Sequence, residues 1–302
     1  MKTKKTPQTT DESKRLREVI REIGLPLRRL QDVILLTPEE CLTWWSNKEA
    51  NHTVNPNAFS RLTEIVAIGE NHLYTGDYDR DLARKRMMGD YLSLPHRYED
   101  NQNSFLRTSA HIIRYIVLTR GQHFADQILY SLNVSPMLYD NLDVRINLTY
   151  FADLLEALSK HGFQQEELDT LASVIFLSLQ ETKLGQSFKE SENLFDIYKT
   201  LATNFDYFDS NFEYKSRFVG KKYILKTTLP LTQHPELKGS PQKIKRLMRY
   251  RRLLSAWFPY LGGMAPLFPK TEVVRFSDDV VETQYVFDLK QHAMRPTKLL
   301  VV

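Results

Sequence analysis

Histidine and cysteine are the side chains that most often carry chemistry, and this sequence scatters them. No two of its eight histidines stand at the spacing of metal ligands, and the single cysteine, Cys41, has no activating neighbour. Neither HExxH, a Walker phosphate loop, GxGxxG nor GxSxG occurs. The sequence therefore predicts no metal centre, no resident cofactor and no enzyme.

His111 is the histidine with the most interesting surroundings. It lies on an otherwise apolar helix face with Ile112 and Tyr115, so it could ligate a cofactor or could be a core or surface histidine. Cys41 is expected to be a small buried hydrophobe.

The composition is that of an ordinary soluble globular protein. Of 302 residues, 42% are apolar and 26% are charged, which is enough for two domains with real cores. No apolar run reaches the roughly 18 residues that span a bilayer, and the basic N-terminus is not followed by a secretory apolar stretch. One cysteine fits a reducing compartment. We expect a cytoplasmic protein without membrane contact.

The segment from Leu25 to Lys48 has the pattern of two short helices joined at a tight corner. Leu30 and Ile34 fall on the first helix, Leu36 lies just past the corner, and Cys41 and Trp44 fall on the second. Apolar residues at these positions clamp the two helices of a helix-turn-helix at a fixed angle, so that the second can enter the major groove of DNA.

Thr37 and Pro38 are the cap and first residue expected of that second helix. The pattern resembles the phage-repressor type of helix-turn-helix, whose five-helix unit would cover about Leu16 to Ile68. Two positions depart from that family. Gln31 replaces a small residue, and Leu35 replaces the corner glycine, so Leu35 must be left-handed or the corner must differ in shape.

The recognition helix begins with two acids, Glu39 and Glu40. Acids are unfavourable near phosphates, yet Glu can accept a hydrogen bond from cytosine N4. Alternatively, carboxylates in a first turn simply complement the helix dipole.

Residues 1–48 hold ten Lys or Arg against seven Asp or Glu, and Arg28 and Arg29 open the helix that crosses the phosphate backbone in the resembling family. The predicted DNA-binding residues are Arg28, Arg29, Thr37, Glu39, Glu40, Thr43 and Lys48. The alternative is a protein–protein adaptor that keeps the helix-turn-helix shape without binding DNA.

A second, weaker corner occurs at Asn133, where Val134, Ser135 and Pro136 open a helix. Leu129 fills its normally small position, and the segment is apolar on several sides, so a buried corner is expected there.

The stretch from Thr119 to Leu158 resembles the sensor domain of one branch of AraC-type regulators. The matching connector residues are Leu138, Asp140, Asp143, Arg145, Ile146 and Leu148. The resemblance implies a ligand-sensing domain over about Ile112 to Leu289. In that family the sensor precedes the DNA-binding helices, whereas here it would follow them.

Central helices are predicted to end at Gly121, Gly162 and Gly185. The last hundred residues then predict a strand over Lys221 to Leu231, a long helix from Pro241, and a hairpin turning at Ser277 to Asp279. The fold class is mainly α with a smaller α+β C-terminal part: a helix-turn-helix unit, central helices, then strand, helix and β-hairpin.

Two features of the C-terminal half suggest ligand contacts. Lys245, Arg246, Arg249 and Arg252 follow one face of the long helix and could hold an anionic ligand or phosphate, or form a solvated face. Aromatic residues crowd the stretch from Phe195 to Phe218 and could line an apolar pocket, or belong to the core or a dimer surface.

Together these patterns predict a flexible tail (1–12), a helix-turn-helix domain (13–69), a connector (70–104) and a sensor or dimerisation domain (105–302). We expect a transcription regulator that binds double-stranded DNA, forms a homodimer and responds to a small-molecule effector.

Overall fold

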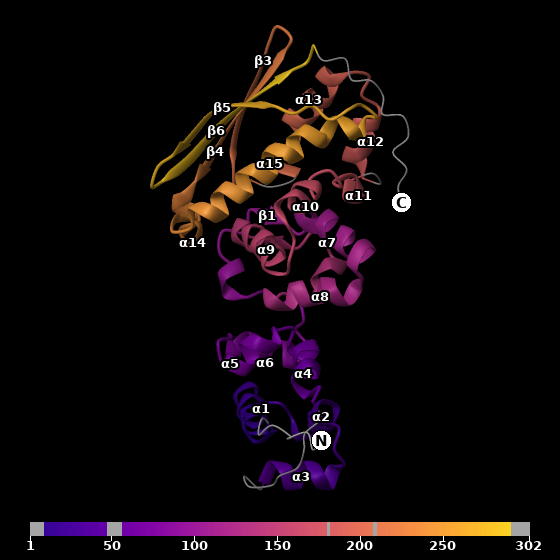
Figure 1. Cartoon of the computed structure of the whole chain (residues 1–302), viewed down its shortest axis with the longest axis vertical. Coiled ribbons are helices and arrows are strands. Elements are labelled where there is room, and N and C mark those ends of the chain that lie inside the picture. Colours follow the sequence, from indigo (N-terminus) through magenta and orange to yellow (C-terminus); the bar gives the residue numbers. More distant parts are fainter. Residues whose placement is uncertain (1–8, 47–55, 180–181, 208–209, 291–302) are drawn as a thin grey trace, which may run out of the picture. The chain divides into compact units, whose positions relative to one another are not determined.

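The computed structural model describes residues 9–46, 56–179, 182–207 and 210–290. The chain divides into two compact units, each described here by itself. The first comprises residues 1–95 and 126–140, and the second comprises residues 96–125 and 141–302. Helices dominate, and strands are fewer and gather in the second unit, as the predicted fold class requires (Figure 1).

The first unit is helical throughout its described part. Its helices are α1 (Thr9–Ile23), α2 (Leu27–Ile34), α3 (Pro38–Ser46), α4 (Ala58–Val66), α5 (Glu70–Thr75), α6 (Arg80–Met87), the end of α8 (Gln122–Ser131) and the 3-10 turn η2 (Pro136–Asp140). Helix α1 already begins at Thr9, inside the segment predicted to be a tail. The rest of that tail, residues 1–8, lies outside the described residues.

Residues 70–95, expected to be connector, belong to this unit. Helix α6 lies within this stretch, and Asp79 caps it by accepting the N–H groups of Asp81 (2.9 Å) and Leu82 (3.0 Å). Leu73 on α5 and Met87 on α6 are buried in the same core as α1 and α4. The polar sequence gives little indication that these helices are core, because each contributes only a few apolar residues to it.

Arg86 on α6 ties the returning stretch 126–140 to the helices of this unit. Its guanidinium is completely buried and donates to four carbonyl oxygens, those of Val66 (3.1 Å), Ala67 (2.6 Å), Ser93 (2.7 Å) and Asn133 (2.7 Å). Burial lowers the pKa of Arg86 to about 10.

The Asn133 corner is buried, as its apolar surroundings predicted. Asn133 has a left-handed backbone (φ 58°), and the neighbouring Val134 and Ser135 are buried. Its side-chain oxygen accepts the N–H of Gly69 at 3.2 Å. A Cβ at Gly69 would lie 3.0 Å from the carbonyl oxygen of Tyr130, so this close approach favours glycine.

The second unit combines helices with an antiparallel sheet. Its helices are α7 (Arg107–Arg120), the start of α8, α9 (Leu148–Lys160), α10 (Gln165–Thr170), α11 (Phe176–Leu179), α12 (Lys183–Lys189), α13 (Leu194–Thr203), α14 (Pro235–Lys238) and α15 (Pro241–Leu261), with 3-10 turns η1 (His96–Tyr98), η3 (Phe205–Tyr207) and η4 (Leu231–Gln233). A small pair joins β1 (Ser104–Phe105) to β2 (Arg145–Ile146).

Glycine stops follow α7 and α9 as predicted: Gly121 caps α7, and Gly162 comes two residues after the last residue of α9. The third expectation was wrong. Gly185 lies buried inside α12, and the predicted single helix is divided among α10, α11 and α12.

The main sheet is antiparallel, in the order β3-β4-β6-β5. Its strands are β3 (Glu213–Val219), β4 (Lys222–Pro230), β5 (Lys270–Phe276) and β6 (Val280–Asp288). The predicted strand, long helix and hairpin are confirmed by β4, α15 and β5–β6. Strand β3 was not anticipated, because its sequence was attributed only to an aromatic-rich stretch.

Alternation along the two central strands sets the buried face of this sheet. Tyr223, Leu225 and Thr227 of β4 are buried, as are Thr283 and Tyr285 of β6. The Tyr285 hydroxyl donates to the carbonyl of Met248 on α15 at 3.5 Å. Figure 1 shows α15 running across the sheet, so this helix and the sheet enclose the core of the second unit.

Candidate functional site

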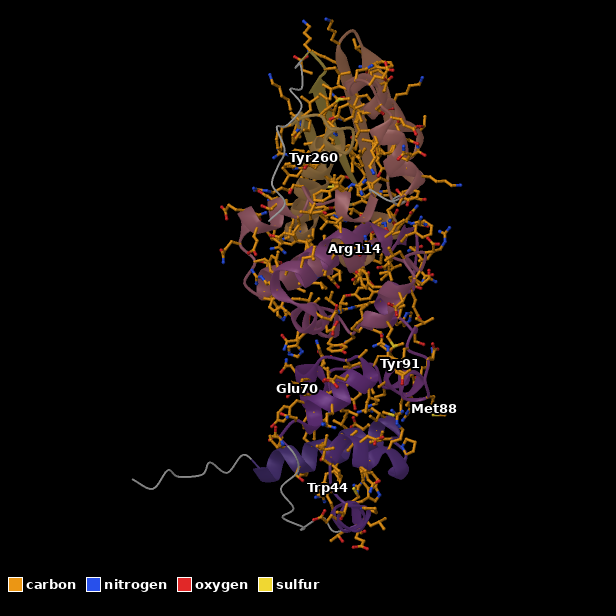
Figure 2. The ribbon with its side chains drawn as sticks, turned by 90° about the vertical axis from the view of Figure 1, so that its right-hand side faces the viewer. Trp44, Glu70, Met88, Tyr91, Arg114 and Tyr260 are labelled. Atoms are coloured by element: carbon orange, nitrogen blue, oxygen red, sulfur yellow. The ribbon has the colours of Figure 1, made fainter. Side chains whose placement is uncertain are left out.

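Apolar side chains hold helices α2 and α3 together in the first unit. Leu30 and Ile34 of α2 and Cys41 and Trp44 of α3 are all buried in one apolar cluster, with Leu36 packed against it. Trp44, labelled in Figure 2, also donates its indole N–H to the Ser13 hydroxyl at 2.9 Å. The α2–α3 pair is therefore held by the residues that the sequence predicted.

The corner between the helices uses a strained leucine. Leu35 has φ 53° and ψ 38°, the left-handed conformation required at this position, and its N–H donates to the Gln31 carbonyl at 2.9 Å. Such a backbone costs a residue other than glycine on the order of 1 kcal/mol. The Leu35 side chain is 49% exposed, so little packing offsets this cost.

Thr37 and Glu40 form a capping box at the start of α3. The Glu40 Oε2 atom accepts the Thr37 N–H at 2.9 Å and the Thr37 hydroxyl at 2.9 Å, and the Thr37 Oγ1 atom accepts the Glu40 N–H at 3.3 Å. One of the two acids therefore has a local structural role that requires no DNA.

The outward side of α3 is acidic and apolar. Glu39, Glu40 and Thr43 are exposed, and Leu42 is 57% exposed. The Thr43 hydroxyl donates to the Glu39 carbonyl at 2.9 Å. No Lys or Arg occurs between Pro38 and Ser46. This surface offers the Glu39 carboxylate and the Thr43 hydroxyl to a partner, beside the exposed Leu42.

Of the basic residues predicted to bind DNA, the structure describes the side chain of one, Arg29. Arg29 donates to the Met87 carbonyl at 3.2 Å, so it stabilises the end of α6. The side chain of Arg28 and the whole of Lys48 lie outside the described residues.

Two arginines of α1 contact the tryptophan pair of α3. The sequence analysis does not predict these contacts. The guanidinium carbon of Arg17 lies 4.8 Å from the Trp44 ring centroid, and that of Arg21 lies 5.0 Å from the Trp45 ring centroid. Arg17 and Arg21 are four residues apart, a spacing that places both on one face of α1 and could have indicated a shared partner.

The second unit contains a partly open cavity of about 70 Å³. Residues of α7, α9 and α15 form one side, and inward residues of β3, β4 and β6 form the other. Phe205 and Tyr214, from the aromatic-rich stretch, both line it and stack with ring centroids 4.0 Å apart. That stretch also supplies Tyr198 to the core of the second unit. Its aromatic residues therefore contribute both to the cavity and to the core.

Two arginines line the cavity. Arg251 on α15 donates to the Tyr214 hydroxyl, and its guanidinium carbon lies 3.5 Å from the Phe212 ring centroid. Arg107 on α7 pairs through Nη2 with Asp143 at 3.1 Å. None of the described residues that line the cavity is Asp or Glu.

His111 is the buried histidine of this cavity. Its Nε2 atom shares a hydrogen bond with the Tyr250 hydroxyl, and in the described part of the chain its Nδ1 atom has no hydrogen-bond partner. Burial lowers the pKa of His111 to about 3, so the ring is neutral near pH 7. A neutral imidazole can accept through one nitrogen and donate through the other.

The basic residues predicted on α15 do not form one anion site. Arg249 makes an ion pair with Asp169, in which its Nε atom lies 2.9 Å from Oδ1, and this hydrogen bond raises the pKa of Arg249. Lys245, Arg246 and Arg252 make no ion pair with any described residue. The arginine that faces the cavity is Arg251. It falls four residues after Leu247 and three after Met248, a spacing that could have placed it on the apolar side.

The AraC-like connector residues divide between the two units. Leu138 and Asp140 fall in the first, and Asp143, Arg145, Ile146 and Leu148 fall in the second. Within the second unit Asp143 pairs with Arg107, and Leu148 lines the cavity. The sensor resemblance stays a prediction.

Across the described ranges, His, Cys, Asp and Glu side chains nowhere gather in the groups of three that could hold a metal ion. Among the same residues, no helix combines the length and the apolar character needed to cross a bilayer.

Comparison with known proteins gives little guidance. No protein-family model matches this sequence, and no curated protein matches it. Among solved structures, one similar chain comes from a study titled "Probing the function of heme distortion in the H-NOX family". It is 10% identical with a TM-score of 0.44, and the match covers 64% of this chain and 98% of that one. A likeness at that level carries no argument about fold or ligand.

Proposed function

We propose that this chain is a DNA-binding transcription regulator whose second unit senses a small molecule. One observation carries the proposal: the buried clamp of α2 and α3 leaves the first turn of α3 facing solvent. Thr37, Glu39 and Glu40 are exposed there, while Cys41 and Trp44 anchor the opposite side of the same helix. This is the arrangement in which a recognition helix can enter a major groove.

The acidic start of α3 is compatible with this function. The capping box accounts for Glu40, which leaves Glu39 and Thr43 to meet base edges. Glu can accept a hydrogen bond from cytosine N4, and Thr can contact any base. Exposed cations of α1, Lys14 and Arg21, are available for phosphates in the same unit. A single short helix reads few bases, so we propose a homodimer that reads two half-sites.

A gel shift of the full chain against genomic fragments, repeated over a salt series, tests the proposal. If a dimer makes about eight phosphate contacts, log K should fall with log salt at a slope of about −7. Replacing Arg28 and Arg29 together by Ala should weaken binding at least tenfold. Arg217→Ala is the control. It also removes an arginine charge, but at an exposed position of β3 in the second unit. Absence of a saturable shift at physiological salt would contradict the proposal.

The second candidate is an adaptor that binds protein instead of DNA. The observation in its favour is that α3 carries no Lys or Arg, while Leu35 and Leu42 are about half exposed. The adaptor predicts no DNA shift. It also predicts that Leu42→Ser abolishes binding to a protein partner, whereas the same change in a DNA reader leaves phosphate binding intact.

The sensing role of the second unit rests on its cavity. A concave, mostly apolar space with a few convergent polar groups is the usual form of a small-molecule site. The proposed regulator is cytoplasmic, because both DNA and metabolites are accessible there.

A further inference from the structure

We propose that the cavity of the second unit binds an uncharged, largely apolar molecule through a carbonyl oxygen, which accepts a hydrogen bond from the His111–Tyr250 pair. The inference rests on the sensing half of the proposed function and names the chemical class of the effector.

The His111–Tyr250 pair holds one hydrogen more than its own contact uses. A neutral imidazole carries one N–H and a phenol carries one O–H, so the pair has two donors. The hydrogen bond between His111 Nε2 and the Tyr250 hydroxyl uses one of them. If Tyr250 donates, the remaining donor is the N–H at His111 Nδ1, and if His111 donates, it is the Tyr250 O–H. In either arrangement the described residues supply no acceptor for the remaining hydrogen.

Both members of the pair are buried and uncharged near pH 7. His111 is 1% exposed and Tyr250 is 3% exposed. Burial lowers the pKa of His111 to about 3 and raises the pKa of Tyr250 well above its ordinary value. Buried polar groups are rarely left without a partner, so the remaining hydrogen marks a favourable position for an acceptor atom of a ligand.

A second donor without a partner lies one helical turn away. Arg107 and His111 are four residues apart on α7, so they share one face of that helix, and both line the cavity. The Nε atom of Arg107 is buried and, within the described part of the chain, has no hydrogen-bond partner. The acceptor end of a ligand is therefore expected against this face of α7.

The two arginines of the wall already have partners within the protein, which favours an uncharged ligand. Arg107 pairs through Nη2 with Asp143 at 3.1 Å. The Arg251 guanidinium donates to the Tyr214 hydroxyl and lies against the Phe212 ring. Neither Asp nor Glu occurs among the described lining residues, so a cationic ligand would have no counter-ion there.

The rest of the wall is mostly apolar. Phe151 of α9, Leu225 of β4, and Leu254 and Phe258 of α15 all line the cavity. A hydrocarbon group that binds against these side chains leaves water, which favours binding. Because the cavity is partly open, a ligand can enter it, and the acceptor defines the expected class, whatever the length of the hydrocarbon.

An NMR titration of the full chain with labelled leucine methyl groups tests the inference, with acetophenone and methyl hexyl ketone as probes. Both ketones should shift the methyl signals of Leu148, Leu201 and Leu254, which line the cavity. Ethylbenzene has nearly the shape of acetophenone but no oxygen, and it serves as the matched control. Benzoate carries a charge on the same ring and should bind more weakly than acetophenone at pH 7.

The His111→Leu variant measures the contribution of the hydrogen bond. The ratio of the acetophenone affinity to the ethylbenzene affinity removes most of the contribution of the shared ring. This ratio should fall about fivefold in His111→Leu, as expected for a hydrogen bond between neutral groups. His111→Gln keeps an amide N–H and should recover part of the ratio. His123→Leu, at an exposed position of α8 in the second unit, should leave it unchanged.

Isotope labelling of the histidine ring nitrogens keeps the test decisive if His111→Leu fails to fold. Saturating acetophenone should move the ring-nitrogen signals of His111 in the unsubstituted chain, because the carbonyl oxygen changes the hydrogen bonding of the His111–Tyr250 pair. Ethylbenzene should move the same signals much less.

Failure of both ketones to bind, or binding of benzoate as tight as that of acetophenone, would overturn the inference. An unchanged affinity ratio in His111→Leu would also overturn it, as would His111 ring signals that acetophenone leaves in place. These readouts involve no DNA, so they are independent of the gel shift. Failure of the ketones with intact DNA binding would leave the regulator proposal standing, and the converse result would leave the ligand assignment standing.

Discussion

The carboxylate of Glu40 accepts both the backbone N–H and the hydroxyl of Thr37 at 2.9 Å, so this acidic residue caps the start of its own helix. Breaking this capping box tests its structural role. Thr37→Ala should lower the free energy of unfolding by about 1 kcal/mol. Glu40→Gln should cost less than half of that, because an amide oxygen can accept the same hydrogen bond. Urea unfolding measures both, and equal losses for the two variants would argue against the box.

Leu35 provides a second test, at the corner between α2 and α3. Because its φ is 53° and its side chain is half exposed, Leu35→Gly should stabilise the chain by roughly 1 kcal/mol, against the usual direction of a glycine substitution. Leu42→Gly, within α3 at a similarly exposed position, should destabilise it by about 1 kcal/mol. Chemical unfolding of the two variants compares them directly, and a loss of stability for Leu35→Gly would show that the corner is not strained.

Arg86 should be among the costliest residues of the first unit to replace. Arg86→Met leaves the carbonyls of Val66, Ala67, Ser93 and Asn133 buried without this donor, which should cost roughly 3 kcal/mol or more. Arg84→Met, two residues away and exposed, should stay within about 0.5 kcal/mol of the parent. Hydrogen exchange of residues 126–140 should accelerate only in the Arg86 variant, since that side chain links them to α4 and α6.

His111 should make stability depend on pH below neutrality. Its pKa is about 3 in the folded chain and about 6.5 when unfolded, so between these values the unfolded chain binds the extra proton. Stability is therefore complete above pH 6.5 and falls as pH drops toward 3, by roughly 1.4 kcal/mol per pH unit. The groups around the ring, Tyr250 on α15 and Arg107 on α7, supply no negative charge to offset this.

The comparison with His111→Gln isolates that contribution. Between pH 7 and pH 5 the parent chain should lose about 2 kcal/mol more than the variant does, measured by urea unfolding at each pH. Parallel losses in the two proteins would show that His111 is not the titrating group.

The elements that the sequence predicted best are those with strong periodicity and explicit end signals. The α2–α3 clamp depends on apolar residues at fixed helical spacing, and Thr37-Pro38 marks where α3 begins. Strands β4 and β6 alternate between buried and exposed residues and flank recognisable turns. Local patterns determine these features, so they can be read without knowledge of the tertiary structure.

The segment expected to be a connector (70–104) is harder to predict from sequence, because the burial of α5 and α6 depends on tertiary contacts. Leu73 and Met87 are isolated apolar residues in polar sequence, and only packing against α1 and α4 makes them core. The division of the predicted helix before Gly185 into α10, α11 and α12 is also hard to predict from sequence. Apolar spacing alone favoured one long helix, whereas Thr182 caps a new one through the N–H of Gly185.

The cavity could be anticipated only in part. The density of aromatic residues predicts a pocket lining in the stretch that supplies Phe205 and Tyr214. The sequence also places His111 on an apolar helix face. The basic pattern of α15 does not single out Arg251, because four other basic residues, Lys245, Arg246, Arg249 and Arg252, follow one face of the same helix. Its convergence with Arg107 depends on contacts between α7, α15 and the sheet, which are distant in sequence.

Site-directed cross-linking from α3 tests the central claim most directly. A photo-reactive cross-linker attached to Thr43→Cys would extend from the exposed side of the proposed recognition helix. The same group attached to Ser187→Cys, exposed on α12 in the second unit, is the control. If α3 reads DNA, Thr43→Cys should form a covalent adduct with duplex fragments selected by gel shift, while Ser187→Cys should form little. Retained DNA binding without an adduct at Thr43→Cys, or equal adducts from both positions, would contradict the claim that this helix enters the groove.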